Sequence, residues 1–413
     1  MTWTFDYLIV GAGFAGLTMA ERLTTQRGKT CLVVEKRPHI GGNAADRYDD
    51  HGVLVHSYGP HYFRTNAPKI VAYLSQFTEW RPVDYEVLSY ADGRYWRFPI
   101  NLNTFEQLIG RSATTAEMEA WLAEHRVAIA EPRNSEEVIL SQVGPLLYEK
   151  FFKDYTLKQW RRHPRDLDPS VCGRIPIRTN RDNRYLRETF QALPRAGYSP
   201  LFERMVAACG PRLRLLLNTD YHDVVPHVAF SHLIFTGPID ELYDHRFGAL
   251  PYRSLRFEHE SFTREQLVAR EPIAGQPGFW QPAMQVNYPD AEAFTRIVEI
   301  KHATGQACSN TTIVREYPDD YGPGKEPFYP VPAADAAACF RRYESLASAG
   351  AVPACLQAAA RHRGAAPAVT LVGRLATYRY YNMDQVVGMA LAEFERLDAC
   401  RPAGGSAPVP RAA

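Results

Sequence analysis

Three glycines near the start of the chain are spaced so that the backbone can hold a dinucleotide. Gly11, Gly13 and Gly16 form the pattern G-x-G-x-x-G. In this pattern the first glycine permits a tight turn, the second lets the backbone approach a pyrophosphate, and the third lets a helix pack closely on a strand. Glu35 follows 19 residues after Gly16, where a carboxylate would accept the hydroxyls of an adenosine ribose. Together these residues predict a dinucleotide site.

A second group of candidate residues comes directly after the acid. Lys36 to Asn43 reads K-R-P-H-I-G-G-N, and its glycine doublet allows a second close approach of the backbone to phosphates. A doublet in this place favours an FAD protein over an NAD enzyme. Farther along, His61 and Arg64 stand in a loop flanked by glycine and proline. Taken alone, these two residues fit a capped loop with a solvated arginine equally well.

Rings and lysines alternate from Tyr148 to Trp160, in Y-E-K-F-F-K-D-Y-T-L-K-Q-W. The rings could belong to a core, but a fully buried face would not tolerate unpaired lysines between them. Arg161 to Arg184 follows, with seven arginines and with proline and glycine as breakers. Such a loop beside exposed rings is a candidate lid over an anionic ligand. Its composition fits an ordinary solvated loop equally well.

The apolar pattern indicates which elements position these residues. Tyr7 to Val10 and Thr30 to Val34 are short β-branched runs, typical of buried parallel strands, and Leu17 to Leu23 between them is helical. Three later strands are expected to return to the same unit, at residues 213–217, 232–235 and 368–372.

Two other regions have a different pattern. Between about residues 103 and 195, the capping box Thr114-x-x-Glu117 and the helical spacing of apolar residues after Ser135 predict a mostly helical insertion. Strands are expected at residues 253–258, 285–288 and 295–301, and an alanine-rich helix from about residue 333.

Bulk properties exclude several classes of protein. With 413 residues the chain can form two or three domains, and its net charge of +1 does not suggest binding to nucleic acid or a membrane surface. No apolar run is long enough to cross a bilayer, and the first apolar run is already a strand of the fold. Seven scattered cysteines without C-x-x-C indicate reduced thiols in a cytoplasmic protein, with no metal site.

The motifs together resemble the UDP-galactopyranose mutase family in its shorter bacterial form. The matching stretches include G-A-G-F-A-G, I-G-G-N, Y-G-P-H, L-K-Q-W, R-I-P-I-R, F-T-G-P-I-D, Y-R-S-L, T-R-I-V-E-I-K-H, P-F-Y-P-V and G-R-L-A-T-Y-R-Y. The resemblance implies an α/β protein, in which a Rossmann-like FAD-binding domain carries an inserted helical domain and an antiparallel β-sheet domain. The implied parts are the FAD-binding domain at 1–100, 196–245 and 331–400, the helical domain at 101–195 with a mobile lid at about 161–184, the antiparallel sheet domain at 246–330, and a disordered tail at 401–413.

The same resemblance implies a reaction. Reduced FAD is the nucleophile: its N5 attacks the anomeric carbon of the sugar, UDP leaves, and the sugar ring opens and recloses. The net change interconverts pyranose and furanose forms of UDP-galactose, UDP-N-acetylgalactosamine or both. A dTDP-deoxysugar substrate, or an amine-oxidase-like FAD oxidoreductase, remains the alternative. An external reductant is expected because no second G-x-G-x-x-G offers an NAD(P)H domain, and a homodimer is expected by resemblance alone.

The resemblance also assigns roles to individual residues. Those implied in catalysis are Arg174, Arg296, His61 and Arg64. Those implied in substrate binding are Phe151, Tyr155, Trp160, Arg174, Tyr185, Arg253, Arg296, Tyr329 and Tyr380. Those implied in cofactor binding are Gly11, Gly13, Phe14, Gly16, Glu35, Lys36, Gly42, Asn43, His61, Arg64, Thr236, Arg374, Asn382 and Met383.

Two positions depart from the usual family pattern. Most members have histidine where this chain has Arg64, and members with arginine there are associated with UDP-N-acetylgalactosamine as well as UDP-galactose. Many bacterial members have aspartate where this chain has Asn382, so a negative charge near the flavin is missing. The polar segment from residue 261 to 278 is also longer than usual, and its role is not assigned.

Overall fold

The computed structural model describes residues 3–269, 278–357 and 366–399. A five-stranded sheet, all parallel, has the strand order β10-β2-β1-β11-β17. These strands are β1 (Trp3–Val10), β2 (Cys31–Val34), β10 (Leu213–Leu216), β11 (Val228–Phe235) and β17 (Ala368–Leu371). The predicted strands from both halves of the chain therefore meet in one sheet.

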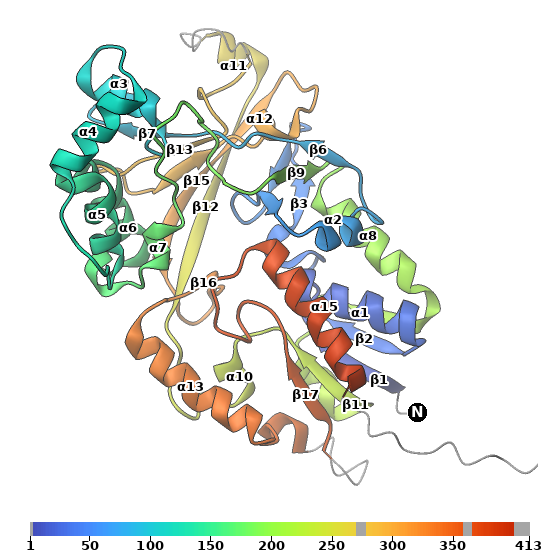
Figure 1. Ribbon diagram of the computed structural model, residues 1–413. Helices are drawn as coiled ribbons and strands as arrows, with labels where there is room; N and C mark the ends of the chain where they lie inside the picture. Colours follow the sequence, from blue (N-terminus) through green and yellow to red (C-terminus); the bar gives the residue numbers. More distant parts are fainter. Residues whose placement is uncertain (1–2, 270–277, 358–365, 400–413) are drawn as a thin grey trace, which may run out of the picture.

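Helices cover both faces of this sheet, which is why its strands are apolar on both sides. Ile9 packs in a core with α1 (Phe14–Arg27) and α15 (Met383–Ala399), whereas its neighbour Leu8 packs in the core on the opposite face with α13 (Ala334–Ser348). Figure 1 shows α1 and α15 side by side over the sheet. A further helix, α8 (Tyr198–Cys209), also packs against α1.

A seven-stranded sheet stands beside the parallel one, with the strand order β16-β12-β15-β14-β13-β7-β8. Its strands are β7 (Val87–Ala91), β8 (Arg94–Phe98), β12 (Tyr252–Phe262), β13 (Gln285–Asn287), β14 (Arg296–Val298), β15 (Thr311–Asp320) and β16 (Tyr329–Pro330). All pairs are antiparallel except β13 with β7, which run parallel.

This sheet corrects two expectations. Residues 87–98 fall in the range expected for the FAD-binding part. They form a hairpin, because Asp92 and Gly93 take the positive φ values of a tight turn, and its strand β7 pairs with β13. The strand expected at 295–301 is limited to β14, and α12 (Lys301–Thr304) follows it. The sequence pattern predicts that a segment forms a strand, but it does not predict which strand it pairs with.

The helical part packs around a hydrophobic core that includes Ile139, Val143 and Phe152. Its helices are α3 (Leu102–Ile109), α4 (Thr115–His125), α5 (Ser135–Tyr148), a π-helical turn (Glu149–Lys153), α6 (Asp154–Trp160) and α7 (Ser170–Gly173). The predicted capping box is confirmed, since the Thr114 hydroxyl accepts from Glu117 N and the Glu117 carboxylate accepts from Thr114 N. Figure 1 shows the long strands β12 and β15 between this part and the parallel sheet.

Short elements complete the described residues. They are the β3–β4 pair (Asp46–Tyr48, Leu54–His56), the sheet β5-β9-β6 (Phe63–Thr65, Phe190–Pro194, Trp80–Pro82), and the helices α2 (Pro68–Leu74), α9 (Tyr221–Val224), α10 (Ile239–Leu242) and α11 (Arg264–Val268). The long polar segment begins with the end of β12 and α11, but its residues 270–277 lie outside the described residues, as does the expected tail at 401–413.

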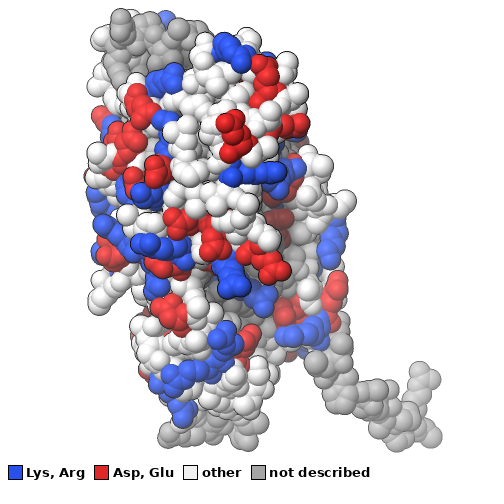
Figure 2. All heavy atoms as spheres, turned by 60° about the vertical axis from the view of Figure 1, so that its left-hand side comes forward, with Lys and Arg blue, Asp and Glu red and all other residues white. Residues whose placement is uncertain are grey.

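The surface carries mixed charge. On the face in Figure 2, basic and acidic side chains are interspersed without a broad area of one sign, in keeping with the net charge of +1. Within the described ranges, no helix is both long and apolar enough to cross a membrane.

Candidate active site

One end of the site begins where β1 ends. Gly11 has a φ of +99°, and a Cβ on it would lie 2.1 Å from Thr236 Oγ1. A Cβ on Gly16 would lie 1.9 Å from the Gly11 carbonyl oxygen, so only glycine lets α1 sit this close to the turn. No side chain caps α1 at Gly13. The first N–H groups of the helix are thus available to an anion.

A second glycine turn approaches the first one. Gly42 has a φ of +56°, and a Cβ on it would lie 3.2 Å from Gly13 Cα. Next to these turns, the buried Glu35 carboxylate at the end of β2 accepts from Ala12 N at 2.9 Å and from Arg37 N at 3.0 Å. Two glycine turns, which have no side chains, and a fixed carboxylate therefore line one cavity. This lining fits the diphosphate and ribose of a dinucleotide.

We call this cavity the cofactor chamber. Of the residues predicted to bind the cofactor, those that line it are Gly11, Gly13, Phe14, Glu35, Lys36, Gly42, Asn43, His61, Thr236, Arg374 and Met383. Gly16 packs behind Gly11 and has a structural role. Arg64 and Asn382 line the neighbouring chamber instead.

The cavity continues through two further chambers. The central chamber shares Asn43, His61, Arg374 and Met383 with the cofactor chamber. The aromatic chamber shares with the central chamber the residues Arg174, Ile175, Tyr185, Arg296, Tyr329 and Tyr380. The three chambers thus adjoin one another in a row from the parallel sheet to the helical part.

Guanidinium groups concentrate where the central and aromatic chambers meet. The Arg174 guanidinium carbon lies 4.6 Å from the centre of the Tyr380 ring, and that of Arg374 lies 5.5 Å from the same ring. Arg296 Nη2 pairs with the buried Glu316 carboxylate at 2.6 Å. Burial raises the pKa of Tyr380, but the charges of Arg174 and Arg374 outweigh it and hold the pKa below its ordinary value. The junction is therefore strongly positive and suited to a diphosphate.

The aromatic chamber is walled by rings from the π-helical turn and α6. Phe151, Tyr155 and Trp160 line it, together with Tyr185 and Tyr329 from other segments. The ring centres of Trp160 and Tyr329 are 6.0 Å apart. A flat, uncharged base fits a chamber of this composition, because every base offers a face for stacking.

Comparison with known proteins decides the family. A sequence profile described as UDP-galactopyranose mutase matches residues 150–380, and one described as NAD(P)-binding Rossmann-like domain matches residues 9–77. A probable UDP-galactopyranose mutase from Klebsiella pneumoniae is 33% identical over 392 residues, which cover 94% of this chain and 93% of the relative. The chain belongs to the UDP-galactopyranose mutase family. It is an enzyme of the isomerase type.

Two other similar proteins show the breadth of this relationship. A dTDP-fucopyranose mutase from Escherichia coli is 29% identical, and the match covers 93% of this chain and 96% of the relative. A crystal structure of reduced UDP-galactopyranose mutase superimposes with a TM-score of 0.69 at 16% identity, covering 96% of each chain. The expected family and fold class are both confirmed.

Some residues of this mutase-family chain lie elsewhere than their predicted role requires. Arg253 lines none of the three chambers. Its Nε donates to the Gln159 carbonyl at 3.2 Å, and it pairs with Asp320. It therefore fastens α6 to the seven-stranded sheet, and the structure does not bring it to the other arginines.

The lysines among the rings also have structural partners. Lys158 Nζ donates to the carbonyl oxygens of Tyr288, Asp290, Glu292 and Phe294 at 2.6–3.2 Å. Lys150 pairs with Asp92. The alternation of rings and lysines in this segment thus reflects contacts with the sheet and its loops, whereas the positive charge that lines the chambers comes from arginines.

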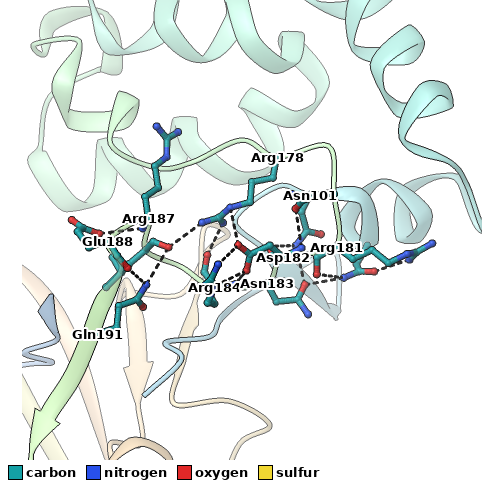
Figure 3. Close-up of polar contacts among 12 residues, drawn as sticks. Asn101, Arg178, Arg181, Asp182, Asn183, Arg184, Arg187, Glu188 and Gln191 are labelled. Carbon is teal, nitrogen blue, oxygen red and sulfur yellow. Dashed lines mark hydrogen bonds and ion pairs between the residues drawn. The ribbon is translucent and has the colours of Figure 1, made fainter. Parts of the chain in front are cut away.

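The second half of the predicted lid is tied down. The buried Asn101 donates to the Asp182 carbonyl at 3.1 Å and to Asn183 Oδ1 at 2.8 Å, as Figure 3 shows. Arg181 pairs with Glu106 on α3. Residues 161–177 contain only short helical turns and carry Arg174 on the cavity wall. The first half is held as well, since Ser135 N donates to the Leu167 carbonyl and Asp168 N donates to the Pro332 carbonyl, both at 3.1 Å. The predicted mobility of the lid stays a prediction.

Two side chains flank the boundary of the cofactor chamber. Burial lowers the pKa of His61 to about 3, so its ring is neutral at neutral pH, and its Nδ1 lies 2.9 Å from the Gly59 carbonyl oxygen. Arg64 Nη2 donates to Asn382 Oδ1 at 3.0 Å. The two departures from the family pattern are thus in direct contact.

Sequence reasoning missed several residues of the central chamber, namely Tyr58, Tyr62, Leu186, Arg187, Glu188 and Gln285. The most consequential is Glu188, whose Oε1 accepts from Arg64 Nε at 3.1 Å. The sequence contains a weak signal for it. Glu188 is the only acid between Arg184 and Arg195, and a partly buried Arg64 needs an acidic partner.

Proposed function

We propose that this protein is a flavin-dependent mutase that interconverts the pyranose and furanose forms of UDP-galactose, UDP-N-acetylgalactosamine or both. One observation carries the proposal: a dinucleotide cradle and a chamber suited to a base and a diphosphate share walls with one central chamber between them. An oxidoreductase would need the first of these features but would have no use for the second.

FAD is the cofactor that the residues of the cofactor chamber fit. Gly11, Gly13 and Gly42 leave backbone exposed to its pyrophosphate, and Glu35 is held where it can accept from a ribose. When bound and reduced, FAD would supply N5 as the nucleophile for the anomeric carbon of the sugar. An external reductant is proposed to keep it reduced.

The chain's own residues act on the rest of the substrate. Arg174 and Arg296 hold the diphosphate of the leaving UDP, where fork-shaped cations match the developing charge. Tyr380, with its lowered pKa, is a stronger hydrogen-bond donor to the same group than an ordinary tyrosine. Tyr155 and Phe151 stack on the uracil, which keeps UDP in place for recapture.

A dTDP-sugar is the second candidate substrate. The similarity to the dTDP-fucopyranose mutase, 29% identical, favours it. A thymine ring would have to place its additional methyl group among the rings of the aromatic chamber. Competition by UDP and by dTDP for the same site distinguishes the two, and tighter dTDP binding would overturn the choice of UDP.

The test of the proposed function uses the FAD-loaded protein reduced with dithionite. It is incubated with UDP-galactofuranose and, separately, with its N-acetyl analogue, and the pyranose product is followed by chromatography. Turnover of at least one is expected. Failure to convert any nucleotide sugar under reducing conditions would refute the proposal, and equal turnover by the oxidised protein would refute the role of reduced flavin.

We further propose that the enzyme is a cytoplasmic homodimer, as the family resemblance implies. Light scattering of the purified protein tests the dimer. A monomer at micromolar concentration would contradict it.

A further inference from the structure

Three side chains from distant parts of the chain form a connected group in the wall of the central chamber. Arg64 lies on β5, Glu188 lies in the loop before β9, and Asn382 directly precedes α15. Arg64 donates through Nε to Glu188 at 3.1 Å and through Nη2 to Asn382 at 3.0 Å. All three line the central chamber and neither of its neighbours. They therefore face whatever occupies the space between the cofactor and the diphosphate site.

Glu188 is held from behind by its own loop. Its Oε2 accepts from Arg187 N at 3.1 Å, and its carbonyl oxygen accepts from Gln191 Nε2 at 2.8 Å. Arg178 in turn donates to the Leu186 carbonyl at 3.0 Å. Figure 3 shows this series of contacts along the segment from Arg178 to Gln191. Besides Arg64, one backbone N–H therefore holds the carboxylate, and side chains of the same loop hold the backbone that carries it.

We propose that Glu188 is the positioning residue that determines which nitrogen of Arg64 faces the sugar. A guanidinium group is planar and rigid, so fixing two of its nitrogens fixes the direction of the third. Nε and Nη2 have partners, and Nη1 has no hydrogen-bond partner among the described residues. Nη1 is therefore the donor presented to an acceptor oxygen on the sugar, either a hydroxyl or an acetamido carbonyl.

A second carboxylate explains why Glu188 matters. Asp384, in the first turn of α15, lies close enough to Arg64 for an electrostatic attraction between the two charges. Without the charge of Glu188, Arg64 would be drawn toward Asp384, because a partly buried guanidinium keeps the strongest available partner. Loss of Glu188 is therefore expected to turn Arg64 and to change which sugars are accepted, while the diphosphate site stays intact.

The inference rests on the proposed function for its substrates, and two measurements test it. The first is the ratio of kcat/KM for UDP-galactofuranose and its N-acetyl analogue, on the reduced FAD-loaded enzyme. Glu188→Gln is expected to change this ratio by about tenfold, the size expected for one redirected charged hydrogen bond. Glu106→Gln, on α3, is the matched control, because it removes the acidic partner of Arg181, which lies in the same loop as Glu188 but outside the three chambers. It is expected to leave the ratio unchanged.

A double substitution separates positioning from structural damage. In an Arg64→His background, Glu188→Gln is expected to have no further effect on the ratio, since the group that it positions is absent. A structural role would instead lower turnover of both sugars equally. An unchanged ratio in Glu188→Gln, or an equal change in the presence and absence of Arg64, would overturn the proposal.

The second measurement does not need turnover. UDP-galactose, UDP-N-acetylgalactosamine and UDP are titrated into the oxidised, FAD-loaded protein. Glu188→Gln is expected to change the ratio of the two sugar-nucleotide Kd values about tenfold and to leave the Kd of UDP within about twofold. If the wild-type protein converted neither sugar, the proposed function would fail while this binding test remained valid. An unchanged ratio of the two Kd values would overturn the role of Glu188.

Discussion

At the scale of single residues, basic side chains that line the cavities are distinct from basic side chains that hold the fold together. Arg174, Arg296 and Arg374 gather at one junction of the cavity. Lys150, Lys158 and Arg253 have the same charge but are bound to the sheet and its loops. Only placement distinguishes the two sets, and each leads to a different expectation for substitution.

Arg174→Ala is expected to lower kcat/KM by about 3 kcal/mol, or somewhat more than 100-fold, because it removes a charged contact to the leaving diphosphate. Thermal unfolding should change little, since Arg174 is exposed in the cavity. Arg162→Ala is the control. Arg162 comes from the same arginine-rich stretch and pairs with Asp335 outside the chambers. Full activity of Arg174→Ala would contradict the diphosphate assignment.

Arg296→Ala is expected to differ from Arg174→Ala by also destabilising the fold. Its removal leaves the buried Glu316 carboxylate without its cation, which typically costs 3–5 kcal/mol. Activity measured per folded molecule and the free energy of unfolding should both fall. A stable but inactive variant would show that Glu316 does not depend on Arg296.

The lowered pKa of Tyr380 predicts a fall of kcat/KM at alkaline pH. Its pKa is below the ordinary value of 10.0, whereas burial raises that of Tyr329 above it. As pH rises through the lowered pKa, Tyr380 becomes an anion that repels the diphosphate, so kcat/KM should fall at alkaline pH below 10. Tyr380→Phe should remove this fall, and Tyr329→Phe should keep it. An alkaline limb that is identical in both variants would contradict the assignment.

At the scale of elements, turns and caps rather than long helices shape the site. The two glycine turns approach within contact distance, and one asparagine both caps α3 and holds the loop that carries Glu188. Both features can be tested with substitutions that are matched in local chemistry.

Gly42→Ala is expected to weaken FAD retention by tenfold or more. Its Cβ would lie 3.2 Å from Gly13 Cα, so the two turns must separate where they would receive the pyrophosphate. Gly52→Ala is the matched control, because Gly52 also has a positive φ, of +75°, but has open space around it. Both variants carry the same backbone strain. Equal loss of flavin absorbance from both would show that strain, and not the close approach, is responsible.

Asn101→Ala is expected to lower the free energy of unfolding by more than the loss of a helix cap alone would. A lost N-cap destabilises by about 1 kcal/mol, and here the hydrogen bonds to Asp182 and Asn183 are lost as well. Trypsin should then cleave faster at Arg181 and Arg184. Thr114→Ala, which removes only the cap of α4, should lower stability without exposing the loop. Equal cleavage in both variants would contradict the anchoring role.

Local patterns predicted the elements better than their pairing. The run of β1, the Thr114 capping box and the glycine turn could be read from the sequence, because each depends on residues that are close in the chain. The hairpin at 87–98 was not predicted, and its residues were placed with the FAD-binding part at 1–100, since its partner β13 lies almost 200 residues later. Glu188 was missed for the same reason, as its partner Arg64 is distant in sequence.

At the scale of the whole molecule, neutral histidines make stability depend on pH. Burial lowers the pKa of His56 and His61 to about 3 and that of His232 to about 4, from an ordinary 6.5. Below pH 6.5 the unfolded chain therefore binds protons that the folded chain does not. The free energy contributed by these groups is complete above about pH 6.5 and is lost progressively as the pH falls toward 3.

A substitution of one histidine tests this dependence. His232 joins β11 to β17 through a 2.8 Å hydrogen bond to Thr370. His232→Gln should reduce the proton uptake on unfolding between pH 4 and 6.5 by up to about one proton, measured from the slope of unfolding free energy against pH. His227→Gln, at an exposed position, is the control. An unchanged slope in His232→Gln would show that His232 does not titrate in this way.

The strand order of the parallel sheet also constrains when the protein can acquire its cofactor. The first glycine turn is translated before β10, β11 and β17, yet all three strands belong to the sheet behind it. The helix that covers α1, α15, is the last element described. The parallel sheet can therefore be completed only after β17 has been translated, and a ribosome that stalls before β17 holds a chain with the first glycine turn but without the completed sheet behind it.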